Sequence, residues 1–167
     1  MLKKKKFKIQ KKKIILAIYG EAGILVLTKI FEFNIPFKNL LIFTHDIKRN
    51  KRLIEILKMY KLKYVFDDNE TNYIKKKFIK FKPNIFLSFY FRNKINEKLF
   101  NIRNCYAINM HPSLLPRYAG CFSNFWNIFN NEKFTGITFH YMTKKFDSGN
   151  ILFQEKIKIN KIDTAFS

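Results

Sequence analysis

The sequence predicts an α/β protein with a Rossmann-like, mostly parallel, twisted sheet and helices on both faces. Short apolar runs alternate with stretches of about ten to fifteen residues in which apolar positions recur at helical spacing. Parallel strands need crossover connections, usually helices, so this alternation favours a parallel sheet. The chain has 167 residues, 47% of them hydrophobic, which is enough for one compact domain with a buried core.

The first strand and helix give the clearest pattern. Ile14–Tyr19 is predicted to be a buried strand, and Gly20–Gly23 the turn that follows it. A helix comes next, because Ile24, Leu27 and Phe31 fall on one helical face. We therefore expect a complete βα unit at the start of the domain.

The same alternation continues to residue 89. It predicts strands at Leu40–Thr44, Tyr64–Phe66 and Ile85–Phe89, and helices marked by Leu53, Leu57 and Tyr60 and by Ile74, Phe78 and Phe81. Pro83 ends the last of these helices, because proline cannot continue the hydrogen-bonding pattern. Ligands of such sheets bind beyond the carboxyl ends of the strands, where the loops after Tyr19, Thr44, Phe89 and Asn109 are expected to converge.

The pattern changes beyond residue 105. A short strand is predicted at Cys105–Asn109, a helix at Gly120–Asn131, and two strands at Gly136–Met142 and Ile151–Ile159. Residues 1–12 show no apolar period, so we expect a lysine-rich tail outside the fold and a single domain over residues 13–167.

The N-terminus resembles a signal peptide only superficially. Its lysines precede the apolar Ile14–Tyr19, but Glu21 follows almost at once and no small-residue cleavage site appears. No uninterrupted apolar run reaches the roughly eighteen residues of a membrane span. Cys105 and Cys121 form no CxxC pair. These features together predict a cytoplasmic protein that does not enter a membrane.

The strong positive charge does not by itself predict nucleic-acid binding. The chain has 33 Lys and Arg against 12 Asp and Glu, a net charge of +21, and such a surface can attract phosphates. However, the lysines are scattered over every segment, and the aromatic excess is phenylalanine. We interpret the charge as a compositional drift, and keep RNA, including tRNA, as a less favoured partner.

The densest motif runs from Asn109 to Gly120. Asn109 and His111 are two residues apart at a strand end, which places both side chains on one face. An amide and an imidazole that face one point can stabilise an oxyanion. The alternative is a histidine capped by a loop carbonyl beside an asparagine that makes a turn bond, and the spacing alone does not separate the two.

Three other features have two interpretations each. Asp147 precedes Ser148 and Gly149 and is a turn residue unless it faces His111, where it could stabilise the imidazolium ion and accept a proton through water. Gly20–Gly23 is a tight turn, or a loop whose N–H groups hold an anion. His140 and His45 are expected to be satisfied core or rim residues. No metal site is predicted, since the histidines and cysteines are scattered.

The ordered set of motifs resembles the 10-formyltetrahydrofolate-dependent formyltransferases. The likeness covers about Lys13 to the end of the chain. Its motifs are Asn109-x-His111, Ser113-Leu114-Leu115-Pro116, Gly120, Thr135-Gly136-Ile137-Thr138 and Asp147-x-Gly149. The family includes enzymes that formylate amino-sugar nucleotides, methionyl-tRNA and glycinamide ribonucleotide, and a formyltetrahydrofolate hydrolase.

The resemblance implies a metal-free formyl transfer from 10-formyltetrahydrofolate to a primary amine. The family's catalytic residues fall on Asn109, His111 and Asp147. Its folate-binding walls fall on two loops and on the motif beside the reacting centre, with the residues Phe91, Arg92, Asn93, Lys94, Ile95, Thr143, Lys144, Lys145, Phe146, Ser113, Leu114, Leu115 and Pro116.

The expected acceptor is a small molecule, a nucleotide-linked amino sugar. Ser88–Arg92 and the pair Thr44-His45 look most like the members that use such acceptors. Methionyl-tRNA and glycinamide ribonucleotide are the alternatives, together with folate hydrolysis. Asp163–Ser167 looks like the start of a helix that family members continue. The catalytic domain is therefore expected to be truncated there, and an inactive copy that binds folate or RNA is a further alternative.

Overall fold

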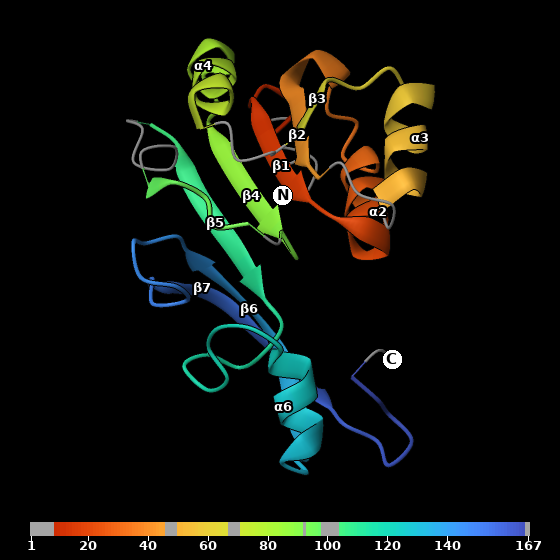
Figure 1. Cartoon of the computed structure of the whole chain (residues 1–167), viewed down its shortest axis with the longest axis vertical. Coiled ribbons are helices and arrows are strands. Elements are labelled where there is room, and N and C mark those ends of the chain that lie inside the picture. The colour runs from red at the N-terminus through yellow and green to blue at the C-terminus, as the bar shows by residue number, and fades with distance from the viewer. Residues whose placement is uncertain (1–8, 46–49, 67–70, 92, 98–103, 166–167) are drawn as a thin grey trace. The chain divides into compact units, whose positions relative to one another are not determined.

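The computed structural model describes residues 9–45, 50–66, 71–91, 93–97 and 104–165 (Figure 1). They belong to two compact units, Met1–Ala107 and Ile108–Ser167. Each unit is described by itself below.

The first unit contains a parallel sheet in the strand order β3-β2-β1-β4 (Figure 1). The strands are β1 (Ile14–Ile18), β2 (Leu40–Thr44), β3 (Tyr64–Phe66) and β4 (Ile85–Phe89). All residues of β1 and β2 are buried. A strand covered on both faces requires a continuous apolar run, and this explains why these two segments show no alternation with polar residues.

Two helices cover one face of this sheet. They are α2 (Gly20–Phe31) and α3 (Lys51–Met59). Leu27 of α2 and Leu53 and Leu57 of α3 are at most 1% exposed, and they belong to one cluster with the alternate strand residues Ile14, Leu16, Ile18, Leu40 and Ile42. Because these strand positions are two apart, they all point to the same side of the sheet.

The opposite face is covered by α4 (Thr71–Phe81). Its Phe78 is fully buried and contacts Phe43 of β2 and Phe86 of β4, with ring centroids 6.4 and 5.8 Å away. Helices therefore lie on both faces. The predicted α/β class and its parallel, helix-covered sheet are confirmed, and the strand and helix boundaries differ from the predicted ones by a few residues at most in this unit.

The expected tail is part of the first unit from residue 9 onwards. Ile9 packs against the hydrophobic cluster. The Gln10 side-chain amide donates to the carbonyl oxygen of Phe33 at 3.2 Å, and the Asn39 amide donates to the Gln10 carbonyl at 3.0 Å. Residues 9–12 were predicted to lie outside the fold, but they contact it, because the apolar side chain of Ile9 packs against the core. Residues 1–8 lie outside the described residues.

The second unit is built on antiparallel strands. The strand β5 (Tyr106–His111) begins in the first unit and continues into the second, where β6 (Phe134–Tyr141) and β7 (Ile151–Lys158) follow. Neighbouring strands here run antiparallel. Asn109 of β5 lies opposite His140 of β6, and this register decides which side chains can meet.

The helix α6 (Ser123–Phe129) is shorter than the predicted Gly120–Asn131. Tyr118, Gly120 and Phe122 all have positive φ angles, of 56°, 94° and 60°. A right-handed helix cannot include such residues, so it begins only at Ser123. The segment between β5 and α6 is consequently a long loop that starts directly after His111.

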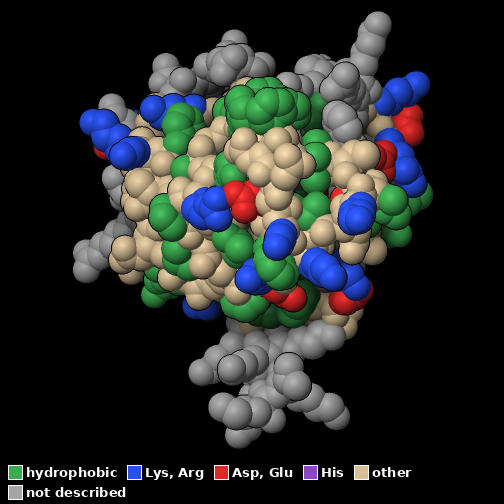
Figure 2. All heavy atoms as spheres, turned by 90° about the horizontal axis from the view of Figure 1, so that it is seen from below, with side chains coloured by type: hydrophobic (Ala, Val, Ile, Leu, Met, Phe, Trp, Pro, Cys, Tyr) green, Lys and Arg blue, Asp and Glu red, His purple; other side chains and the backbone are tan. Residues whose placement is uncertain are grey.

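The described surface carries mixed charge on the face that Figure 2 shows. Lys and Arg side chains, in blue, are interspersed there with hydrophobic side chains in green and acidic ones in red (Figure 2). This face has no continuous basic field. Within the described ranges, no helix has the length and apolar character that crossing a membrane requires.

Candidate functional site

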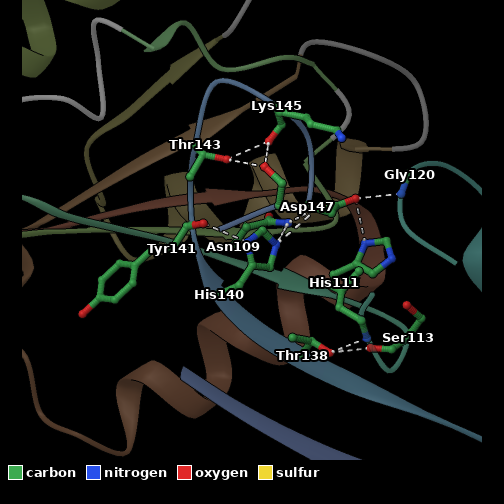
Figure 3. Close-up of polar contacts among 12 residues, drawn as sticks. Asn109, His111, Ser113, Gly120, Thr138, His140, Tyr141, Thr143, Lys145 and Asp147 are labelled. Carbon is green, nitrogen blue, oxygen red and sulfur yellow. Dashed lines mark hydrogen bonds and ion pairs between the residues drawn. The ribbon is translucent and has the colours of Figure 1, made fainter. Parts of the chain in front are cut away.

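The second unit brings together the three predicted catalytic residues. The extended backbone of β5 places Asn109 and His111 on one face, and the loop after β6 carries Asp147 to them (Figure 3). The His111 Nδ1 atom lies 3.3 Å from Asp147 Oδ2, and the two side chains are only 5% and 8% exposed. Asp147 therefore faces His111, as its catalytic interpretation requires, and is more than a turn residue.

The Asp147 carboxylate is fixed by backbone as well as by side chains. The backbone N–H of Gly120 donates to Oδ2 at 2.8 Å. Asp147 itself has a φ of 50°, a conformation that aspartate tolerates better than most residues. Two residues later, Gly149 lies so close to Tyr141 that a Cβ atom would overlap the Tyr141 carbonyl oxygen. Gly149 thus permits the tight loop that aims Asp147 inward.

His111 has an acceptor at each ring nitrogen. Nδ1 faces the Asp147 carboxylate, and Nε2 donates to the carbonyl oxygen of Tyr118 at 2.8 Å. A carbonyl and a carboxylate can only accept, so the ring satisfies both when each nitrogen carries a proton. Both ring nitrogens of His111 therefore lie beside oxygens that act as acceptors.

The Asn109 side chain lies on the other side of the same carboxylate. Its Nδ2 atom is 3.5 Å from Asp147 Oδ1, a long hydrogen bond, and 3.3 Å from Nε2 of His140. Amide, imidazole and carboxylate consequently form one polar cluster. Such a cluster can donate two hydrogen bonds to a developing oxyanion and accept a proton beside it.

His140 belongs to this cluster, although its sequence context predicted a core or rim residue. Its Nε2 atom lies 3.3 Å from Asp147 Oδ1, and its Nδ1 atom 2.9 Å from the carbonyl oxygen of Tyr141. The observation that identifies His140 as a member of the cluster is the strand register, which places it opposite Asn109. That register is a tertiary property and cannot be deduced from the spacing of residues.

The environment shifts two pKa values in opposite directions. Burial opposes the charged form of Asp147, but the hydrogen bonds from His140 and Gly120 and the positive charge of the neighbouring rings outweigh it and lower the pKa of the carboxyl group. Burial also opposes the charge on His140. The hydrogen bond with Asp147, the bond to the Tyr141 carbonyl and the negative charge of Asp147 prevail, and the pKa of His140 is raised.

The Ser113–Pro116 motif is anchored to the strands behind it. The Thr138 hydroxyl donates to the Ser113 carbonyl at 2.6 Å and accepts from the Leu115 N–H at 3.1 Å, while Gln154 donates to the Leu115 carbonyl at 2.8 Å. Leu114 lies against Gly136. A Cβ atom on Gly136 would overlap both the Leu114 side chain and the Glu155 carbonyl oxygen. The motif, with its cis Leu115–Pro116 bond, is therefore held firmly after His111.

The loop before Asp147 is ordered by its own hydroxyl groups. Thr143 Oγ1 bonds the Lys145 carbonyl and Ser148 Oγ, both at 2.8 Å, and Ser148 also donates to the Lys145 carbonyl at 3.0 Å. Lys144, Lys145 and Phe146 are exposed. Their expected role in folate binding stays a prediction.

The remaining predicted site residues lie in the first unit. Phe91 stacks on His45, with ring centroids 4.3 Å apart, so the loops after β2 and β4 meet there. Asn93 and Ile95 are half-buried and Lys94 is exposed. Arg92 lies outside the described residues. The role of these residues in folate binding also stays a prediction.

Gly20–Gly23, predicted as a turn before the helix, form the first turn of α2 instead, and one buried side chain ties it to the loop after β2. Asn50 accepts from the Gly20 N–H at 3.0 Å and donates to Thr44 Oγ1 at 2.6 Å and to the His45 carbonyl at 2.5 Å. The turn thus has a structural role in joining two strand ends. Among the described residues, no group of three His, Cys, Asp or Glu side chains could hold a metal ion.

The fold and the polar cluster define an α/β protein with an amide–imidazole–carboxylate site on the strand β5 and the loop after β6. Comparison with known proteins then identifies the family. The family model described as formyl transferase matches residues 3–167, and the chain belongs to that family.

Two relatives are similar to this chain over most of its length. The chain is 38% identical over 162 residues to the bifunctional polymyxin resistance protein ArnA of Wigglesworthia glossinidia brevipalpis, covering 93% of this chain and 24% of ArnA. It is 30% identical over 156 residues to the GDP-perosamine N-formyltransferase of Brucella melitensis, covering 93% of this chain and 60% of that enzyme. The chain thus spans less than two thirds of both relatives.

Solved structures share the fold. The phosphoribosylglycinamide formyltransferase of Anaplasma phagocytophilum superposes with a TM-score of 0.77 at 20% identity, over 93% of this chain and 76% of that one. WlaRD, a sugar 3N-formyl transferase crystallised in the presence of dTDP and 5-N-formyl-THF, gives a TM-score of 0.71 at 23% identity, over 92% and 54% of the two chains. These likenesses confirm the α/β fold class.

Proposed function

We propose that this chain transfers a formyl group from 10-formyltetrahydrofolate to the primary amine of a nucleotide-linked amino sugar. The observation that carries the proposal is the cluster in which the Asp147 carboxylate lies between His111 and Asn109. The GDP-perosamine N-formyltransferase, 30% identical over 93% of this chain, supports an amino-sugar acceptor.

The donor set of the cluster fits the chemistry of acyl transfer. The folate supplies the formyl carbon, and negative charge develops on its oxygen when an amine attacks. Asn109 Nδ2 and His111 Nε2 donate hydrogen bonds to that oxygen, which stabilises the charge where it forms. His111 Nε2 donates to the Tyr118 carbonyl before substrate binds and exchanges this acceptor for the formyl oxygen.

The protons are handled by His111 and Asp147. Asp147 keeps His111 positively charged, because the two lie 3.3 Å apart in a buried site. It accepts the proton that the attacking amine loses, through a water molecule. His111 gives a proton to the folate nitrogen as the bond from that nitrogen to the formyl carbon breaks. A carbon–nitrogen bond to the amine replaces it.

The function is tested by following the release of tetrahydrofolate from 10-formyltetrahydrofolate by the purified chain. The acceptors are a panel of nucleotide-linked amino sugars, glycinamide ribonucleotide and methionyl-tRNA, with a reaction lacking any amine to detect hydrolysis. We expect turnover with an amino-sugar nucleotide and little without an amine. Equal release in every reaction points to the hydrolase, and release in none contradicts the proposal.

A further inference from the structure

His140 is buried on β6, the strand between β5 and β7. Its side chain is 3% exposed, and its Nδ1 atom lies 2.9 Å from the carbonyl oxygen of Tyr141. A carbonyl oxygen only accepts, so Nδ1 carries a proton and donates it. Any change of protonation of this ring therefore takes place at Nε2.

Nε2 of His140 faces two groups of the proposed catalytic cluster. It lies 3.3 Å from Asp147 Oδ1 and 3.3 Å from Asn109 Nδ2. The charged ring donates to the carboxylate, and the neutral ring accepts from the amide, so Nε2 serves one of these groups at a time. With a buried carboxylate at this distance, the charged ring is the favoured form, in agreement with the raised pKa of His140.

The two oxygens of Asp147 are held by different groups. Oδ2 accepts from the Gly120 N–H at 2.8 Å and faces His111. Oδ1 faces His140, and the bond from Asn109 to it is long, at 3.5 Å. The His140 ring nitrogen is thus nearer to Oδ1 than the Asn109 amide is. Without His140, Oδ1 keeps only the long bond from Asn109, and the orientation of the carboxylate toward His111 depends on the Gly120 N–H alone.

We propose that His140 is a positioning residue that fixes the Asp147 carboxylate toward His111 through a hydrogen bond from Nε2 to Oδ1. This inference rests on the proposed function, because positioning has a catalytic meaning only if Asp147 and His111 take part in the reaction. The titratable groups that face His140 are Asp147 itself and, across the carboxylate, His111.

The test compares two substitutions at one position. His140→Leu removes the donor, whereas His140→Gln keeps a nitrogen donor near the place of Nε2. Ile137→Ala serves as the control, because Ile137 lies on the same strand and takes no part in the polar cluster. All three are made in the full chain, and the thermal midpoint of each is measured first, to separate loosening of β6 from loss of the hydrogen bond.

The first readout does not depend on activity. The Asp147 carboxyl carbon is titrated by ¹³C NMR in each variant. The hydrogen bond from His140 and the charge of its ring both lower the pKa of Asp147. We therefore expect this pKa to rise most in His140→Leu, to rise less in His140→Gln, which keeps a donor but not the charge, and to stay close to that of the wild type in Ile137→Ala.

The second readout is steady-state formyl transfer. We expect kcat of His140→Leu to fall about tenfold or more, the scale on which removing an outer-shell partner impairs a site, with KM little changed. His140→Gln restores most of kcat. KM is expected to change little because His140 acts on Asp147 and makes no contact with substrate in the proposed reaction.

The outcomes separate this inference from the proposed function. An active wild type with unchanged kcat and unchanged Asp147 pKa in His140→Leu overturns the positioning role. So does a loss of kcat that Ile137→Ala reproduces at an equal thermal midpoint. A wild type that transfers no formyl group, combined with a raised Asp147 pKa in His140→Leu, overturns the proposed function while the hydrogen bond stands.

Discussion

At the scale of single residues, Asp147 connects every polar group of the site. Its Oδ2 atom faces His111 and accepts from Gly120, and its Oδ1 atom faces His140 and Asn109. A buried carboxylate that loses its charge no longer stabilises a neighbouring imidazolium ion. The charge of this one side chain is therefore expected to matter more than its shape.

Asp147→Asn tests that charge. The amide oxygen can still accept from the Gly120 N–H, so the loop is retained, but the negative charge next to His111 is lost. We expect kcat for formyl transfer to fall by about 10²-fold or more, as in sites that lose one electrostatic stabiliser. Glu155→Gln, an exposed acid on β7, is the control and should leave kcat unchanged. A fully active Asp147→Asn enzyme would contradict the proposed mechanism.

The interaction of His140 with Asp147 makes the free energy of unfolding depend on pH. The folded-state pKa of Asp147 is below its ordinary 3.8, so its contribution is present above that value and is lost as the pH falls through the folded pKa. The folded-state pKa of His140 is above its ordinary 6.5, so its contribution is complete below 6.5 and is lost as the pH rises through the folded pKa.

The difference in unfolding free energy between wild type and His140→Leu measures this contribution. We expect the part of that difference that depends on pH to be largest between about pH 4 and 6.5 and to decline above that window. Urea unfolding at a series of pH values gives the curve. A difference that is flat from pH 4 to 9 would show that His140 does not carry its charge in the folded protein.

At the scale of elements, the loop between β6 and β7 is held by a close backbone approach and by hydroxyl bonds. Gly149 approaches Tyr141 so closely that a side chain at this position would overlap the Tyr141 carbonyl, and Thr143 and Ser148 close the loop by hydroxyl bonds. Asp147 is aimed by this local geometry as much as by its partners. The loop is thus a structural requirement of the site.

Gly149→Ala is expected to disturb this loop. The added methyl group must push the strand ends apart, at a cost of about 1–3 kcal/mol, the usual range for overpacking. We also expect formyl transfer to fall, because Asp147 moves with the loop. Thermal unfolding and activity are measured beside Asn150→Ala, an exposed neighbour that should change stability by no more than about 0.5 kcal/mol. Equal effects of the two substitutions would refute the tight approach.

At the scale of the whole molecule, the net charge of +21 comes from lysines and arginines that are scattered along the whole sequence. Lys and Arg are mixed with other side chains on the face that Figure 2 shows. Counterion release makes any binding of RNA to such a surface steeply dependent on salt. The charge therefore predicts a weak and nonspecific affinity.

This prediction is tested by fluorescence anisotropy with a labelled tRNA and a labelled homopolymer of equal length. We expect both to bind at low salt with similar affinity, and the logarithm of the affinity to fall linearly with the logarithm of the salt concentration. A tRNA complex that is tighter than the homopolymer complex and persists at high salt would instead favour the methionyl-tRNA alternative.

The sequence by itself determined the elements of the first unit. Short continuous apolar runs such as Ile14–Ile18, alternating with helical patterns, indicate buried strands, and the helical stripes of Leu27, Leu53 and Leu57 indicate what covers them. It also placed Asn109 and His111 on one face, because alternation along a strand is a local property. The ordered motifs predicted the family, which the comparison confirmed.

Only the tertiary structure decided what meets these residues. The contact between Asp147 and His111 joins positions 36 residues apart, and the place of His140 depends on the register of β5 with β6. The late start of α6 follows from positive φ angles at Tyr118, Gly120 and Phe122, two of which are aromatic residues whose identity does not predict this conformation. Periodicity reports which face of an element is buried, whereas register and loop conformation arise from packing between distant segments, and these brought the second histidine into the site.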